Sequence, residues 1–216
     1  MAGTKQAAVG FRVHSGWAAM VAVSLEKGGP VVLCRERAHL VKVFSYAYRQ
    51  PYHTAEKMPL EEARSFIAQV RDEARGLAYG ALRRMQARVD EAGYRLNRSA
   101  LLLASGRELP ELEKILASHA LIHTADGELF REALKHASEK SGYGVVPVRE
   151  RELLGQAAKV LRGKEGALLR RVTELGKPFG APWSQDEKSA TLAAWVALSS
   201  YGDDPGAAAR AKTRKN

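Results

Sequence analysis

Residues 7–23 read AAVGFRVHSGWAAMVAV, and this stretch sets the expected fold of the first part of the chain. Two short apolar runs flank a turn of small residues, a pattern typical of two antiparallel strands. The stretch contains no aspartate or glutamate. Its polar side chains around the turn are Arg12, His14 and Ser15. The hairpin therefore predicts a sheet whose first strand ends in basic residues.

The next residues extend this hairpin into a three-stranded meander. Residues 27–30 form a turn, and residues 31–40 (VVLCRERAHL) form the third strand. Residues 41–57 are rich in aromatic side chains, and Pro51 opposes regular strand pairing, so we expect a loop there. Its tyrosines either cover a sheet edge, which we favour, or stack unpaired bases beside Arg49.

Later segments alternate between helices and strands. A long apolar stripe predicts a helix over residues 60–92, and short apolar runs predict strands over residues 99–104 and 144–148. Further helices are expected over residues 109–117, 125–141, 150–161, 166–175 and 184–200. The expected fold class is α/β, with three antiparallel strands followed by two parallel strands and helices on both faces. We expect one domain over residues 1–202 and a basic, disordered tail over residues 203–216.

Composition limits the function classes. The chain has 216 residues, of which 45% are hydrophobic, so it can build a core. It has no apolar run of membrane-spanning length and only one cysteine, Cys34, which excludes an internal disulfide and favours the cytoplasm. The net charge of +10 favours a polyanionic partner such as DNA or RNA.

The order of elements resembles the ribonuclease H-like fold, and more closely its Holliday-junction-resolvase branch. Residues 9–18 (VGFRVHSGWA) are similar to that branch's first strand, turn and second strand. The remaining similarity lies in residues 127–134 (GELFREAL), 145–149 (VVPVR) and 184–198. The chain also resembles uncharacterised bacterial proteins predicted to share this fold. The resemblance implies nucleic acid as the partner, and Mg²⁺ or Mn²⁺ as the cofactor of an active nuclease.

The chain departs from that family where the family holds its metals. Two-metal hydrolysis needs several converging carboxylates, which the family draws from the first strand, the end of the fourth strand and the last helix. The first strand here has no acid, and the fourth ends in Ala104 and Ser105 with Glu108 beyond them. On the last helix, Asp186 or Glu187 is the one plausible metal ligand. We therefore expect little or no metal-dependent cleavage and no required cofactor.

The acids of the last helix also have a structural interpretation. Residues 184–187 (SQDE) match a capping box, in which Ser184 caps the helix and Glu187 bonds back to it. Acids in a first helical turn also complement the helix dipole. We favour this interpretation over a metal-binding one.

A pair of histidines has metal-ligand spacing. His119 and His123 lie four residues apart, which suits two ligands on one helical face. No HExxH pattern accompanies them, and Thr124 reads as the cap of the following helix. We therefore interpret both histidines as surface or packing residues.

Basic residues gather near the expected carboxyl edge of the sheet, where α/β proteins bind ligands. The candidate nucleic-acid-binding residues are Arg12, His14, Arg149, Arg151, Arg162, Lys164, Arg170 and Arg171. The alternative is a solvated helical surface in which Glu150, Glu152 and Glu165 balance the charge.

Three functional hypotheses follow. The leading one is a nucleic-acid-binding domain with a degraded metal site. The second is an active nuclease with an unusual site, whose candidate catalytic residues are Glu108, Glu128, Asp186 and Glu187. The third is a non-catalytic interaction module or homodimer, in which Gly76 and Gly80 allow a neighbouring backbone to approach the long helix.

Overall fold

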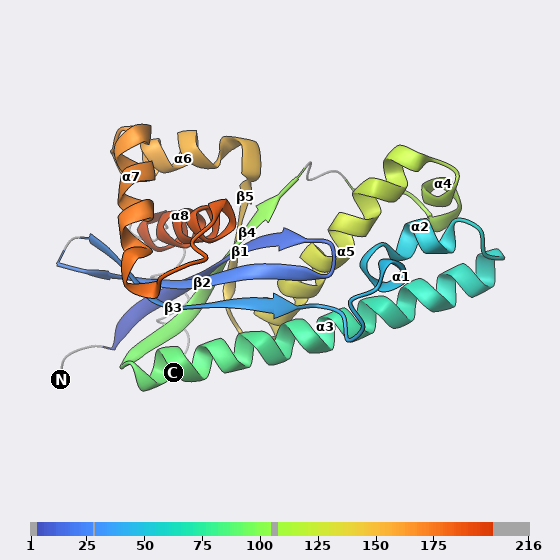
Figure 1. Ribbon diagram of the computed structural model, residues 1–216, viewed down its shortest axis with the longest axis horizontal. Helices are drawn as coiled ribbons and strands as arrows, with labels where there is room; N and C mark the ends of the chain where they lie inside the picture. The colour runs from blue at the N-terminus through green and yellow to red at the C-terminus, as the bar shows by residue number, and fades with distance from the viewer. Residues whose placement is uncertain (1–3, 28, 105–107, 201–216) are drawn as a thin grey trace, which may run out of the picture.

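A computed structural model describes residues 4–27, 29–104 and 108–200. Ser105 and the expected tail over residues 203–216 lie outside these ranges. The described chain forms one five-stranded mixed sheet with helices on both faces (Figure 1). The expected α/β fold class is confirmed. No helix in the described ranges is both long enough and apolar enough to cross a membrane.

The sheet has the predicted mixture of strand directions. Three strands form the antiparallel meander: β1 (Lys5–His14), β2 (Trp17–Glu26) and β3 (Gly29–His39). β4 (Tyr94–Leu103) is parallel to β1, and β5 (Gly144–Arg149) is parallel to β4. The strand order is β3-β2-β1-β4-β5, which puts β1 at the centre of the sheet. β4 begins earlier than the apolar run alone predicted.

The first helices follow the meander. Residues 41–57 were predicted to be a loop, and this was wrong, because they contain α1 (Tyr46–Arg49) and α2 (Pro51–Ala55). Pro51 opposes a strand but suits the first turn of a helix. The long helix α3 (Leu60–Glu91) agrees with its prediction.

The later helices needed smaller corrections. α4 (Leu112–Leu116) is short. α5 (His119–Lys140) begins before Thr124, which is therefore no cap; its hydroxyl donates to the Ala120 carbonyl inside the helix. The remaining helices are α6 (Leu153–Val160), α7 (Glu165–Leu175) and α8 (Gln185–Ser199), with 3-10 turns at Glu150–Glu152 and Lys177–Phe179.

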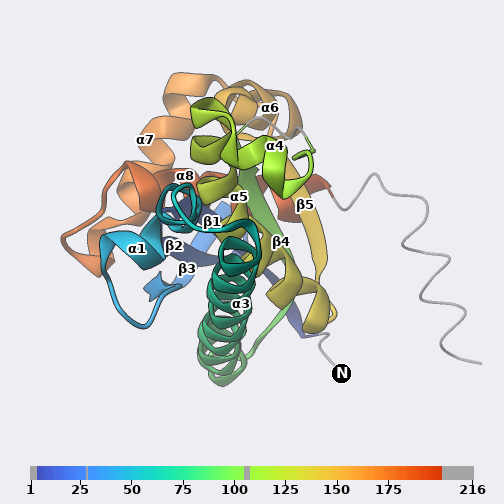
Figure 2. The same cartoon turned by 90° about the vertical axis from the view of Figure 1, so that its right-hand side faces the viewer.

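Strand alternation divides the core into two layers. Phe11 and Leu101 pack in the core beneath α3 and α5, whereas Ala100 and Leu102 pack beneath α6, α7 and α8. Figure 2 shows α3 on one side of the sheet and α6 and α7 on the other. Neighbouring residues of one strand therefore serve different layers.

Glycine controls how closely α8 approaches the sheet. A Cβ atom on Gly10 would lie 1.8 Å from the Ala190 carbonyl oxygen, so α8 rests on the bare backbone of β1. No described segment of the chain makes the close approach expected at Gly76, since nothing lies within 4 Å of its Cβ position. At Gly80 the nearest atom belongs to the flexible Arg84 side chain of the same helix.

Candidate functional site at the carboxyl edge of the sheet

Four polar side chains, two of them acidic, meet where β1 and β5 end and α8 begins. Arg12 and His14 share the face of β1 on which Gly10 contacts α8. Glu150 follows β5 directly, and Asp186 lies in the first turn of α8. We call these four residues the edge cluster.

The edge cluster is an ion-pair network centred on Arg12. Arg12 Nη2 lies 2.8 Å from Glu150 Oε1, and Arg12 Nε lies 3.8 Å from Asp186 Oδ1. The same Asp186 oxygen lies 2.8 Å from His14 Nε2. The side chains of Arg12 and Asp186 are only 21% and 24% exposed, so solvent screens their pairing less than on an open surface. Each carboxylate of the network therefore has a basic partner from β1.

An aromatic stack adjoins this network. The rings of His14 and Trp17 lie parallel, with centroids 4.3 Å apart and planes within 8°. The Arg37 guanidinium lies 3.7 Å from the centre of the Trp17 ring system. Trp17 therefore connects the edge cluster to a cation on β3 through contacts with the faces of its ring system.

Two cavities open beside Asp186. One, of about 230 Å³, is lined by Arg12, Glu150 and Asp186 together with the basic residues Arg151 and Lys188. The other, of about 520 Å³, lies between the Trp17 stack and the start of α8. The edge cluster is therefore accessible from two sides.

The capping box at the start of α8 is confirmed. The Ser184 backbone N–H and hydroxyl both donate to Glu187 Oε2, at 2.8 and 2.6 Å, and the Ser184 hydroxyl accepts from the Asp186 N–H. Glu187 therefore stabilises the helix terminus. Asp186, by contrast, turns its carboxylate toward Arg12 and His14.

Glu108 and Glu128 lie elsewhere. Both line a cavity of about 390 Å³ with Leu101 and Leu129, in the layer beneath α3 and α5. Glu128 is paired with Arg131 at 3.1 Å. The structure thus brings these two acids to one cavity, which Asp186 and Glu187 do not line. Glu108 also lines a second cavity, of about 380 Å³, with Arg151, a residue of the smaller cavity beside Asp186.

The other candidate basic residues have different environments. Arg151 shares the smaller cavity with Arg12, and Arg149 pairs with Glu152 at 3.3 Å. The remaining four are exposed along α7 and the link before it: Arg162, Lys164, Arg170 and Arg171. On the long helix, Arg84 and Arg88 both pair with Glu36, so part of the positive charge is balanced internally.

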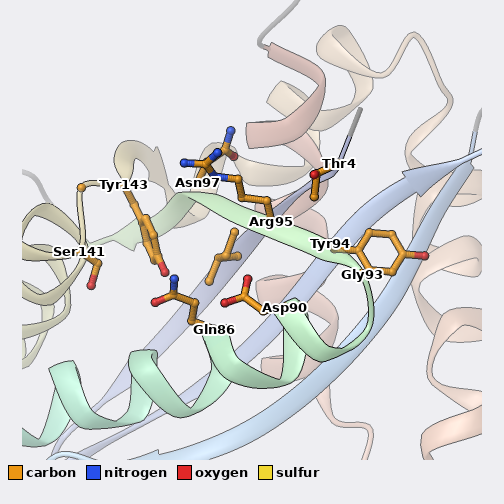
Figure 3. Close-up of a pocket in the computed structure, with 11 residues that line it drawn as sticks. Thr4, Gln86, Asp90, Gly93, Tyr94, Arg95, Asn97, Ser141 and Tyr143 are labelled. Carbon is orange, nitrogen blue, oxygen red and sulfur yellow. The ribbon is translucent and has the colours of Figure 1, made fainter. Parts of the chain in front are cut away.

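A polar cavity of about 520 Å³ lies at the other end of β4 (Figure 3). Gln86 and Asp90 project into this region from α3, with Tyr143 beside them. The Tyr143 hydroxyl is buried and has no hydrogen-bond partner among the described residues. Burial, followed by the nearby Asp90 carboxylate, raises the pKa of Tyr143 to about 12. This cavity contains none of the candidate site residues.

Sequence reasoning missed three members of the edge region. Glu150 was treated only as a balancing charge, although its place just beyond a parallel strand is where ligands gather. Trp17 was noted only for its resemblance to a family motif. Arg37 had no signal of its own, because its contact with Trp17 depends on the register between β2 and β3.

Comparison with known proteins supports the fold. No family model matches the chain, and no curated protein matches it. A structure of Thermus thermophilus RuvC is similar with a TM-score of 0.49 and 12% identity, covering 91% of this chain and 96% of that one. T. thermophilus RuvC in complex with a Holliday junction substrate is similar with a TM-score of 0.50 and 11% identity. This match covers 91% of this chain and 95% of the RuvC chain. At this identity the likeness concerns the fold alone, which is the expected ribonuclease H-like one.

Proposed function

We propose that this chain binds nucleic acid at the carboxyl edge of its sheet without two-metal cleavage. The observation that carries the proposal is the position of Arg12, which contacts both Glu150 and Asp186. A cation fixed on the protein takes the place that a bound metal would need between these acids.

The edge cluster does not fit Mg²⁺ or Mn²⁺. Two-metal chemistry needs several carboxylates that are free to converge on the ions. Here Asp186 Oδ1 is engaged by both Arg12 and His14, and Glu150 by Arg12. A divalent ion would be repelled by the guanidinium and would have to break these pairs. The edge cluster therefore supports no metal-dependent step.

Several features favour a nucleic acid as the ligand. The net charge of +10 suits a phosphate backbone. Arg151 and Lys188 line the smaller cavity, where they can contact phosphate oxygens. RuvC, whose fold is similar, is described in complex with a Holliday junction substrate, so a branched DNA is the first ligand to test.

The alternative of an active nuclease built from Glu108, Glu128, Asp186 and Glu187 has less support. Glu108 and Glu128 line a different cavity from Asp186, and Glu187 is committed to the helix cap. The alternative of a partner or second copy packed at Gly76 stays a prediction: no described segment of this chain covers that residue.

Binding can be tested by fluorescence anisotropy with junction, duplex and single-stranded DNA and RNA over a range of salt. We expect affinity to fall as salt rises. We expect the double variant Arg151→Ala/Lys188→Ala to weaken binding about tenfold or more and to lower the salt slope by about 2.

The control is a charge-matched double variant at the opposite edge, Arg95→Ala/Lys140→Ala. Both of its residues are exposed, and Arg95 lines the cavity in Figure 3. An equal loss of affinity in both double variants would contradict the assignment of the binding edge. Binding that does not respond to salt would contradict the proposal as a whole.

A further inference from the structure

Three imidazoles converge at a second place on the molecule. His53 comes from α2, and His119 and His123 come from the first turns of α5. One potential ligand atom from each residue lies within 4.8 Å of the other two, and the Nε2 atoms of His119 and His123 are 3.1 Å apart. We call these residues the histidine cluster.

The start of α5 explains why the cluster forms. Because the helix begins at His119, the spacing of four residues puts His119 and His123 on one face. Asp126 follows three residues later, so it shares that face. α2 packs beside this turn and supplies His53, whose ring lies 4.4 Å from that of His123 between centroids.

A buried carboxylate orients His53. His53 Nδ1 lies 2.5 Å from Asp126 Oδ2, and the Tyr52 backbone N–H donates to Asp126 Oδ1 at 2.8 Å. Asp126 is only 3% exposed. Burial raises the pKa of its carboxyl, an effect that the hydrogen bonds from His53 and Tyr52 oppose. With Nδ1 held by the carboxylate, Nε2 is the nitrogen of His53 that remains available.

Metal-binding histidines typically have this arrangement, in which the second ring nitrogen is bonded to a carboxylate that fixes the ring. Two nitrogens on one tetrahedral zinc ion, with bonds of 2.0–2.1 Å, lie about 3.3 Å apart. The His119–His123 separation already approaches that value. Both of these residues are exposed, so an ion can enter and the rings can adjust.

We propose that His53, His119 and His123 bind one divalent transition-metal ion of the zinc class, with Asp126 as the positioning residue for His53. Three imidazoles suit Zn²⁺, Ni²⁺ or Cu²⁺, whereas Mg²⁺ prefers oxygen ligands. Three protein ligands leave a fourth position open to water or to a ligand. The bound ion would connect α2 to α5 and so stabilise the short helices that follow the meander. This proposal does not depend on the proposed function of the edge cluster.

Isothermal titration of the tag-free full chain with Zn²⁺ at neutral pH tests the site. We expect one ion per chain with a Kd tighter than about 0.1 mM, and a higher melting temperature in the presence of Zn²⁺. We also expect the visible absorption typical of tetrahedral Co²⁺ when that ion replaces zinc. Mg²⁺ is expected to produce none of these effects at the cluster.

Single variants identify the ligands. We expect His119→Ala and His123→Ala each to weaken zinc binding at least about tenfold, and Asp126→Asn to weaken it about 10–100-fold while the fold is retained. His136→Ala, on the same helix but outside the cluster, is the matched control and is expected to bind as the wild type does. Circular dichroism of each apo variant checks that the fold is intact.

A Kd weaker than about 0.1 mM for the wild type would overturn the proposal. So would zinc binding that His119→Ala and His123→Ala leave unchanged, or that His136→Ala weakens equally. The side-chain oxygen of Asp126→Asn can still accept the N–H of Tyr52 in α2. The effect of this variant therefore reports the orientation of His53 and not the loss of the backbone hydrogen bond from Tyr52.

Discussion

Arg12 on β1 is paired with Glu150, the residue that follows β5, at a distance of 2.8 Å. β4 lies between these two strands, so the pair reaches across a neighbouring strand at the carboxyl edge of the sheet. Asp186 from α8 adds a second carboxylate and His14 a second base. Charges from strands and helices far apart in the sequence are thereby neutralised at the place where α/β sheets commonly bind ligands.

The first prediction concerns Arg12→Asp. This variant removes the guanidinium and adds a carboxylate beside Asp186 and Glu150. Because Mn²⁺ prefers carboxylate ligands, we expect an Mn²⁺ affinity at least about tenfold above that of the wild type, measured by titration calorimetry. Arg12→Met removes the charge without adding a ligand, and its Mn²⁺ affinity is expected to rise much less. An Mn²⁺ affinity of Arg12→Asp no higher than that of the wild type would contradict the role given to Arg12.

The second prediction concerns Gly10→Ala. The added methyl group would meet the Ala190 carbonyl, a backbone atom that can move only with α8. We expect the free energy of unfolding to fall by about 1–3 kcal/mol or more, as in other overpacked cores. Urea denaturation of the wild type and of Gly10→Ala measures this difference in the free energy of unfolding. An unchanged midpoint would show that α8 does not rest on β1 as described.

The third prediction concerns Gly76→Ala, on an open face of α3. Nothing lies within 4 Å of the added methyl group, and alanine is the better helix former. We expect the free energy of unfolding to rise by about 0.5–1 kcal/mol. Sedimentation of the wild type and of Gly76→Ala shows whether the substitution changes the oligomeric state. A loss of oligomer or a lower free energy of unfolding in Gly76→Ala would contradict an open helix face and favour close packing at Gly76.

The fourth prediction concerns the alkaline stability of Tyr143→Phe. Burial raises the pKa of Tyr143 in the folded state to about 12, above the ordinary value of about 10. The neutral phenol therefore stabilises the fold fully below pH of about 10, and this contribution is lost as the pH rises toward about 12. We expect the free energy of unfolding of Tyr143→Phe to fall less steeply than that of the wild type in this window. Tyr46→Phe, at a position 61% exposed, is the control and should follow the wild-type curve.

Much of the fold could be predicted because local patterns agree with tertiary pairing. The apolar alternation of residues 7–23 and the stripe of α3 each identify their element without long-range information. The start of α5 was misplaced because Thr124 resembles a cap, although its hydroxyl bonds within the helix. The aromatic segment was misread because Pro51 can begin a helix as well as interrupt a strand.

The candidate sites were less predictable for a physical reason. Arg12, His14 and Asp186 could be named from the sequence, since they lie at the end of the first strand and at the start of the last helix. The contacts among these three residues depend on how closely α8 approaches Gly10. Local sequence patterns do not predict that distance. The histidine cluster was dismissed for the same reason, because its third member, His53, comes from a helix that the sequence did not predict.

The most direct test of the central claim is a cleavage assay in which the protein is present at a concentration that saturates the nucleic acid. The salt concentration is kept low enough for all of the substrate to be bound. Junction, duplex and single-stranded substrates would be incubated with Mg²⁺ or Mn²⁺ and their products resolved on a denaturing gel. We expect binding without metal-dependent products, both in the wild type and in Asp186→Ala/Glu187→Ala. Cleavage by the wild type that requires the metal and disappears in Asp186→Ala/Glu187→Ala would contradict the account.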